Sequence, residues 1–232
     1  TSTVDGTSDS VYLGTEVGVM VIQEKEGDTL DGSLKVVTKD YISEEMVGDI
    51  RGMWSLYETA NLTVVDTAIA DASYKDSELI VNGNGGTPSI TSVSGVRGTA
   101  LHFDGIDDYL CSNGGSGTAC ADDNDLDFGV NMSVGTWVKL DSVGVSDMIV
   151  GKGSSYYLTV GSTTLGCDAE KFGFTSWAGS SWDCASSQTA PNTGEWYHVI
   201  GTSDGTDIRI YINGQLEATT TKGNPPASAT FL

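Results

Sequence analysis

Alternating apolar and polar residues near the C-terminal end of the chain predict three successive β-strands. In residues 207–212 every second residue is isoleucine, so one face of the predicted strand is apolar. This period of two is typical of a strand with one buried face. Asp-Gly at residues 204–205 and Asn-Gly at residues 213–214 favour the positive backbone angles of tight hairpins. Residues 195–218 are therefore predicted to form an antiparallel meander.

The same alternation occurs upstream, in residues 98–110 and in residues 132–140. The first of these stretches reads Gly-Thr-Ala-Leu-His-Phe-Asp-Gly-Ile-Asp-Asp-Tyr-Leu, and its Leu101 and Phe103 are expected to pack inward. Together with the Trp-Val-Lys run in the second stretch, this sequence motif resembles that of the laminin G-like (concanavalin A-like) jelly-roll domain. The resemblance implies an all-β jelly-roll β-sandwich over residues 52–232 that binds glycans or proteins through its loops.

Two parts of the chain depart from this resemblance. Modules of this family usually finish with further strands, and the sequence motif of those strands does not occur before Leu232. Either the sequence is an excerpt from a longer polypeptide, or another chain supplies the strand by β-augmentation. Residues 1–51 are predicted as a separate β segment, in which residues 10–50 resemble a single β-propeller repeat. Its alternatives are a plain hairpin packed on the sandwich and a strand, residues 11–22, donated to a neighbouring subunit.

The charge of the chain restricts its partners. Asp and Glu total 32 against 11 Lys and Arg, which gives a net charge of −21. No nucleic acid is expected as a partner, and an anionic membrane surface is a poor one, because phosphate binding needs clustered basic side chains. No apolar run is long enough to span a bilayer, so no membrane insertion is expected in this segment. The chain starts with Thr1 and shows no signal peptide, so either a targeting segment has been removed or the sequence is an excerpt.

Four cysteines predict two disulfides and an oxidising, extracytoplasmic setting. Cys111 and Cys120 bracket a short flexible segment, and Cys167 and Cys184 bracket a longer loop that contains tryptophan. Four cysteines allow three pairings, of which neighbour pairing is the simplest. A zinc site is the rival interpretation, but the chain has no Cys-x-x-Cys motif.

The sequence does not predict an enzyme. Its two histidines, His102 and His198, lie within strand patterns and are expected to be structural, and no Gly-x-Ser-x-Gly motif is present. Glycosidases of the retaining type need two carboxylates close together. The nearest candidates, Glu24 and Glu26, lie outside the predicted sandwich.

Calcium is the cofactor that the acidic loops favour, because it prefers oxygen ligands. Asp147, at the entry to a predicted strand, lies where calcium-binding relatives such as the pentraxins contribute ligands. Residues 122–127 alternate carboxylates, but the glycine and glutamate positions of an EF-hand loop are not matched. Asp104, Asp107 and Asp108 are expected to cap turns.

Aromatic residues supply the candidate ligand site. Loop tryptophans held by a disulfide can stack on sugar rings, anchor a protein contact or cover a sheet edge. The candidates are Trp177, Trp182, Tyr156 and Tyr157. Asn-x-Ser/Thr sequons predict glycosylation at Asn61 and, less accessibly, at Asn131.

These patterns predict a non-enzymatic adhesion or assembly module of a larger protein, extracellular or on the cell surface. Its expected partners are glycans or other surface proteins. One alternative is a structural subunit of an extracellular filament, assembled by strand sharing. A second alternative is a divergent glycan-active enzyme with paired acids on a concave sheet face.

Overall fold

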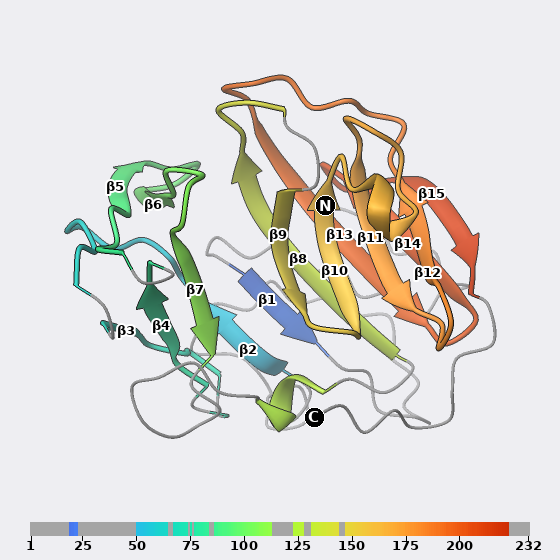
Figure 1. The fold of residues 1–232 in the computed structure, drawn as a ribbon, viewed down its shortest axis with the longest axis horizontal. Helices are drawn as coiled ribbons and strands as arrows, with labels where there is room; N and C mark the ends of the chain where they lie inside the picture. Colours follow the sequence, from blue (N-terminus) through green and yellow to red (C-terminus); the bar gives the residue numbers. More distant parts are fainter. Residues whose placement is uncertain are drawn as a thin grey trace, which may run out of the picture.

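The computed structural model shows two facing antiparallel sheets with two smaller sheets beside them (Figure 1). It describes residues 19–22, 50–64, 67–73, 75, 77–83, 86–112, 123–127, 131–143 and 147–222. The all-β sandwich expected from the alternating pattern is thereby confirmed. No helix in these described residues is long and apolar enough to cross a membrane.

The larger sheet has six strands in the order β15-β14-β13-β8-β1-β2. These strands are β1 (Val19–Ile22), β2 (Ile50–Trp54), β8 (Asn131–Lys139), β13 (Trp196–Asp204), β14 (Asp207–Ile212) and β15 (Gln215–Thr221). Strands β13, β14 and β15 pair antiparallel in sequence order, which confirms the predicted meander. Its turns use positive φ angles at Gly205 (86°), Asn213 (51°) and Gly214 (81°), as Asp-Gly and Asn-Gly predict.

Strand β1 occupies an interior position of this sheet. It pairs with β8 on one side and with β2 on the other, both antiparallel. Residues 19–22 therefore complete a sheet of their own chain, whereas the donor-strand alternative placed residues 11–22 in a neighbouring subunit. The remaining residues from 1 to 49 lie outside the described part, so the propeller-like repeat and the division at residue 51 stay predictions.

The smaller sheet of the sandwich has four strands in the order β12-β11-β10-β9. These strands are β9 (Asp147–Lys152), β10 (Tyr156–Val160), β11 (Phe172–Trp177) and β12 (Trp182–Ser186). A short 3-10 helix, η2 (Thr163–Leu165), lies in the connection between β10 and β11. In Figure 1 this sheet lies across β8, β13 and β14. The hydrophobic core is formed by residues of both sheets.

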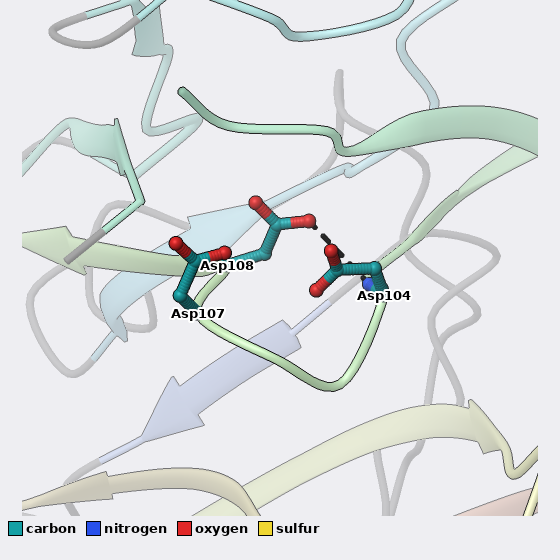
Figure 2. A group of neighbouring side chains, drawn as sticks. All are labelled: Asp104, Asp107 and Asp108. Carbon is teal, nitrogen blue, oxygen red and sulfur yellow. Dashed lines mark hydrogen bonds between the residues drawn. The ribbon is translucent and has the colours of Figure 1, made fainter. Parts of the chain in front are cut away.

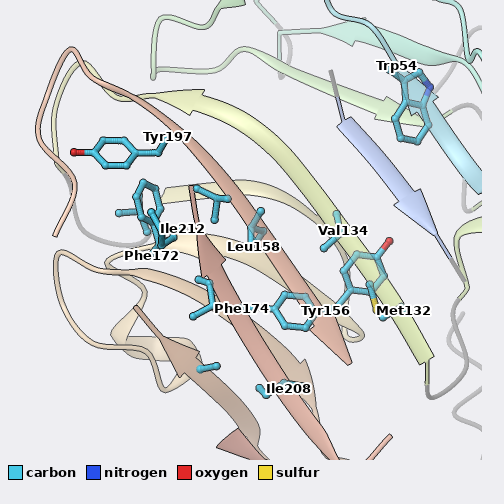
Figure 3. Close-up of a cluster of buried hydrophobic side chains, with 14 residues drawn as sticks. Trp54, Met132, Val134, Tyr156, Leu158, Phe172, Phe174, Tyr197, Ile208 and Ile212 are labelled. Atoms are coloured by element: carbon cyan, nitrogen blue, oxygen red, sulfur yellow. The ribbon is translucent and has the colours of Figure 1, made fainter. Parts of the chain in front are cut away.

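Fourteen buried side chains from both sheets form the core (Figure 3). Phe172, Phe174, Ile208 and Ile210 are fully buried within it. The sheets approach closely at Gly201, because a Cβ there would lie 2.2 Å from the ring of Phe174. Burial of large aromatic and branched side chains on both facing sheets is what holds such a sandwich together.

Two smaller sheets lie beside β1 and β2 (Figure 1). Their strands are β3 (Ala68–Ile69), β4 (Leu79–Asn82) and β7 (Tyr109–Ser112) in one, and β5 (Thr91–Ser94) and β6 (Thr99–His102) in the other. They enclose a second apolar cluster of Leu62, Ile69, Val81 and Ile90. Leu56 and Leu79 pack against both clusters, so the two cores are continuous.

One inward residue was predicted wrongly. Leu101 is half-buried and packs against the second cluster, but Phe103 is 37% exposed. The reason is that β6 ends at His102, so Phe103 lies in the loop that follows and the alternation no longer applies.

A second 3-10 helix, η1 (Asn124–Leu126), contains Asp125. The carboxylate of Asp125 forms an ion pair with Lys75 at 2.7 Å, which joins η1 to the loop between β3 and β4.

Candidate functional site

Three aromatic side chains gather on the outer face of the four-stranded sheet. Tyr157 comes from β10, Trp177 from the end of β11 and Trp182 from the start of β12. We call these three residues the aromatic trio. The ring centroids of Tyr157 and Trp182 are 5.3 Å apart, and those of Trp177 and Trp182 are 5.2 Å apart in an edge-to-face arrangement. All three residues are half-buried, so each is partly accessible to solvent.

Strand register explains why these residues meet. Trp177 and Trp182 are direct cross-strand partners at the β11–β12 hairpin. Tyr157 lies two strands away from Trp182, and neighbouring strands are about 4.8 Å apart. Because β11 separates β10 from β12, the two rings reach each other only by leaning over β11. The trio therefore covers the middle strand instead of standing in separate rows.

Tyr156, the fourth predicted ligand-binding aromatic, is not part of this group. Successive residues of a strand point to opposite faces. Tyr156 consequently points into the core between the sheets and is 3% exposed. Burial raises the pKa of its phenol, and the nearby carboxylates Asp127 and Asp123 act in the same direction. The structure thus separates Tyr156 from its sequence neighbour.

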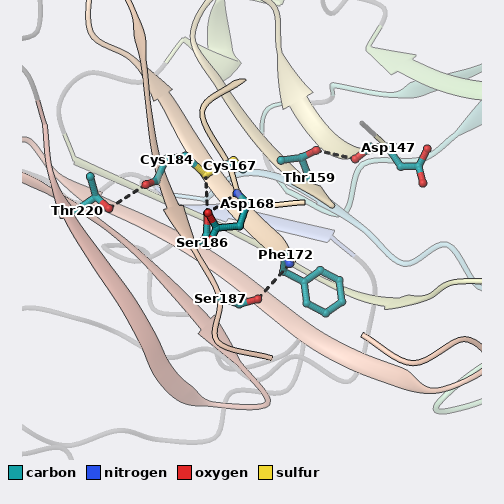
Figure 4. Close-up of a disulfide and its surroundings, with 9 residues drawn as sticks. All are labelled: Asp147, Thr159, Cys167, Asp168, Phe172, Cys184, Ser186, Ser187 and Thr220. Carbon is teal, nitrogen blue, oxygen red and sulfur yellow. Dashed lines mark hydrogen bonds between the residues drawn. A yellow bond between two sulfur atoms is a disulfide. The ribbon is translucent and has the colours of Figure 1, made fainter. Parts of the chain in front are cut away.

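A disulfide and a glycine support the trio. Cys167 is bonded to Cys184, two residues beyond Trp182, as neighbour pairing predicted (Figure 4). The disulfide ties the connection that contains η2 to β12. Gly151, the cross-strand partner of Tyr157, leaves room for the tyrosine ring, because a Cβ there would lie 2.2 Å from it.

The second predicted disulfide is described only at one end. Cys111 is disulfide-bonded. Cys120 lies outside the described residues, so the pairing of Cys111 with Cys120 stays a prediction. The Cys167–Cys184 bond by itself is typical of proteins outside the reducing cytoplasm.

Asp104, Asp107 and Asp108 form the acidic group that comes closest to a metal site in the described residues (Figure 2). One carboxylate oxygen from each lies within 4.8 Å of the others. Two of these carboxylates also serve turn contacts: Ile106 N donates to Asp104 at 2.8 Å, and Ser89 N donates to Asp108 at 2.9 Å. The amide of Ile106 is the main cause that lowers the pKa of Asp104.

This group offers three hard oxygen ligands, whereas calcium takes six to eight. Turn capping accounts for the arrangement that the sequence predicted. Asp147, the predicted metal ligand, is exposed at the start of β9 and does not join an acidic group of three within the described ranges. Its backbone carbonyl accepts a hydrogen bond from Thr159 at 2.7 Å (Figure 4). Calcium binding stays a prediction.

Both histidines have structural contacts. His102 Nε2 lies 2.6 Å from Asp141 Oδ2, and this contact links β6 to the residues after β8. His198 stacks on Trp137 with 5.0 Å between ring centroids, on the outer face of the six-stranded sheet. Burial lowers the pKa of His198.

The two predicted glycosylation sites differ in exposure. Asn61 is exposed, and its side-chain oxygen accepts a hydrogen bond from Ser92 N at 3.0 Å. Asn131 is half-buried at the start of β8, where it pairs with Asp204 of β13. Modification of either residue stays a prediction.

Comparison with known proteins places the fold in a family. A model described as the concanavalin A-like lectin/glucanases superfamily matches residues 113–232, which is more than half of the chain. No curated protein matches the chain.

Three solved structures are similar to the chain. Domain 4 of an extracellular GH43 arabinanase from Geobacillus stearothermophilus, in complex with arabinotriose, is 18% identical, with 73% of this chain and 79% of that chain covered and a TM-score of 0.49. An S-layer domain-containing protein from Clostridium thermocellum is 20% identical, with 78% and 79% covered and a TM-score of 0.37. A protein from Bacteroides ovatus designated as carbohydrate binding is 22% identical, with 39% and 26% covered and a TM-score of 0.33. The chain therefore spans about a quarter of the length of the Bacteroides ovatus structure.

The facing antiparallel sheets, the apolar layer between them and the family match all agree. The chain belongs to the concanavalin A-like lectin/glucanases superfamily.

Proposed function

We propose that this chain is a non-enzymatic, extracellular glycan-binding module of a larger surface protein. The observation that carries the proposal is the convergence of Tyr157, Trp177 and Trp182 from three strands onto one solvent-facing patch. Aromatic rings stack on the apolar faces of sugars, so a patch of partly exposed rings is suited to bind them.

The surroundings of the trio favour a neutral glycan. Cross-strand register assigns eight positions of β10, β11 and β12 to the outer face, and none of these described positions carries a charged residue. They are Tyr157, Thr159, Gly173, Thr175, Trp177, Trp182, Cys184 and Ser186. In a chain with a net charge of −21, an uncharged patch fits an uncharged ligand better than an acidic one.

The same positions argue for binding over hydrolysis. The superfamily name includes both lectins and glucanases, so membership leaves both activities open. A glycosidase of either stereochemical type needs two carboxylates flanking the scissile bond. The eight described outward positions of β10, β11 and β12 offer none, which favours a module that holds a glycan without cleaving it.

Assembly by strand sharing is the alternative that the position of β1 disfavours. Residues 19–22 pair with β8 and β2 of the same chain, so this segment is engaged within its own sheet. We therefore propose that the module adheres through the trio. The alternative to a glycan as the partner is another surface protein.

Substitution of the trio tests the proposal. We expect Tyr157→Ala and Trp177→Ala each to weaken binding to neutral oligosaccharides about tenfold or more, which corresponds to roughly 1.4 kcal/mol. Isothermal titration with a panel of neutral trisaccharides built from glucose, galactose, mannose or arabinose measures the effect. Tyr109→Ala is the matched control, because Tyr109 is 39% exposed on β7, away from the trio. Wild-type protein that binds no member of the panel, or trio variants that bind like wild type, would contradict the proposal.

A further inference from the structure

Strand β11, an interior strand of the four-stranded sheet, carries a buried hydroxyl group beneath the aromatic trio. Thr175 is the cross-strand partner of Tyr157 on one side and of Cys184 on the other, so its side chain lies on the same outer face. This side chain is 0% exposed, and within the described part of the chain its Oγ1 has no hydrogen-bond partner. Buried hydroxyl groups are normally paired, because an unpaired one loses its bonds to water without replacement.

The trio accounts for the burial of Thr175. Tyr157 and Trp182 lean toward each other from the strands on either side of β11, and their ring centroids are 5.3 Å apart. They meet over the part of β11 that presents Thr175 and Trp177. Valine has nearly the same shape as threonine and would fill this position without burying an unpaired polar group. Packing at this position requires a side chain of this shape, which valine also has. Packing therefore does not explain why the side chain of Thr175 carries a hydroxyl group.

Trp182 is the member of the trio that is best placed to move. It is the first residue of β12, and β12 is an edge strand of the four-stranded sheet. Trp177 belongs to the interior strand β11, and its backbone amide donates a hydrogen bond to the carbonyl of Ser155 at 2.9 Å. A change of rotamer at Trp182 would uncover Thr175 without disturbing the pairing of β10 with β11.

On the basis of the proposed function, we propose that Thr175 Oγ1 is the hydrogen-bonding group at the floor of the glycan site. Trp182 turns aside, a neutral sugar residue stacks against Tyr157 and Trp177, and one hydroxyl or hydroxymethyl group of the sugar bonds to Thr175. A site built to bond a hydroxyl rejects a sugar that lacks it, because the buried partner is then left unpaired. Thr175 would therefore select the sugar, whereas the rings supply general affinity.

Thr175→Val tests this role, and Thr159→Val is its matched control. Thr159 is also 0% exposed and lies on the same face of β10, but its hydroxyl donates to the carbonyl of Asp147 at 2.7 Å (Figure 4). The two variants therefore remove a hydroxyl without a partner and a hydroxyl with one. We expect Thr175→Val to keep or raise the melting temperature while affinity falls about tenfold or more for the trisaccharide that wild type binds best. Thr159→Val should lower the melting temperature and leave the affinity unchanged.

The outcomes separate the two proposals. Wild-type protein that binds none of the neutral trisaccharides overturns both. Binding that Trp177→Ala abolishes and Thr175→Val leaves unchanged overturns the role of Thr175 alone and keeps the proposed function.

The coupled circular-dichroism signal expected from the Trp177–Trp182 pair gives an independent measurement of the movement of Trp182. We expect a saturating trisaccharide to abolish this signal in wild type, and a signal that persists at saturation overturns the movement of Trp182.

Discussion

At the scale of single residues, side-chain orientation decides which aromatic groups are available to a ligand. Tyr156 and Tyr157 are neighbours in sequence, yet one is a core residue and the other belongs to the aromatic trio. The two-residue period predicts that they face opposite ways, but periodicity does not say which face is outside. Only the pairing of β10 with β11 answers that question, since it places Leu158 opposite the fully buried Phe174.

Gly151 is the residue on which the position of Tyr157 depends. A Cβ at Gly151 would lie 2.2 Å from the Tyr157 ring and 2.6 Å from the carbonyl of Tyr156. We expect Gly151→Ala to displace the ring, weaken glycan binding and lower the free energy of unfolding by roughly 1–3 kcal/mol. Titration calorimetry and urea denaturation measure the two effects.

The control for this variant is Gly153→Ala. A Cβ at Gly153 would make only an ordinary contact, 3.9 Å from the Tyr157 hydroxyl. If both variants behaved alike, close approach of Gly151 to the ring would not be the cause.

His198 predicts a dependence of stability on pH. Burial lowers its pKa from 6.5, so below pH 6.5 the unfolded chain binds a proton more readily than the folded chain does. The free energy of unfolding is therefore expected to fall as the pH decreases through this window. Denaturant titrations between pH 7.5 and about 5, repeated on His198→Gln, isolate the contribution. The variant should show a smaller decline; an identical decline would assign the effect to groups other than His198.

At the scale of elements, local sequence predicts strands better than it predicts their neighbours. The Asp-Gly and Asn-Gly turns connect β13, β14 and β15 as expected, because a tight hairpin is a local structure. The contact between Tyr157 and Trp182 depends on two non-adjacent strands and has no local signal. The sequence also does not predict that the hydroxyl of Thr175 lacks a hydrogen-bond partner among the described residues, because threonine is a common strand residue.

The disulfide between Cys167 and Cys184 is expected to stabilise the trio side of the sandwich. Its cysteines are 17 residues apart, and closing a loop of this size contributes about 3 kcal/mol. We expect the Cys167→Ser/Cys184→Ser double variant to lose this amount in urea denaturation and to bind glycans more weakly. A loss well below about 1 kcal/mol would show that the surrounding strands hold β12 unaided.

At the scale of the whole molecule, charge and binding face are separated. The net charge of −21 is spread over a chain whose proposed glycan site is uncharged on its described outward positions. Salt screens self-repulsion between exposed like charges but has little effect on ring stacking. The two properties should therefore respond differently to ionic strength.

We expect glycan affinity to change less than about twofold between about 50 mM and 500 mM NaCl. Over the same range the melting temperature should rise, because net charge of one sign opposes the compact state. Calorimetric titration and thermal unfolding in the same buffers provide the comparison. An affinity that falls steeply with salt would instead indicate a charged ligand.

The interior position of β1 has a consequence for how the protein is made. Ile22 pairs with Ser133, so the larger sheet unites segments that are synthesised far apart in time. Pairings of such long sequence separation slow folding, and an apolar strand that waits for its partner is prone to associate with other chains. Strand β1 can pair early with β2, but its edge that faces β8 stays unpaired until residues 133–135 have been synthesised.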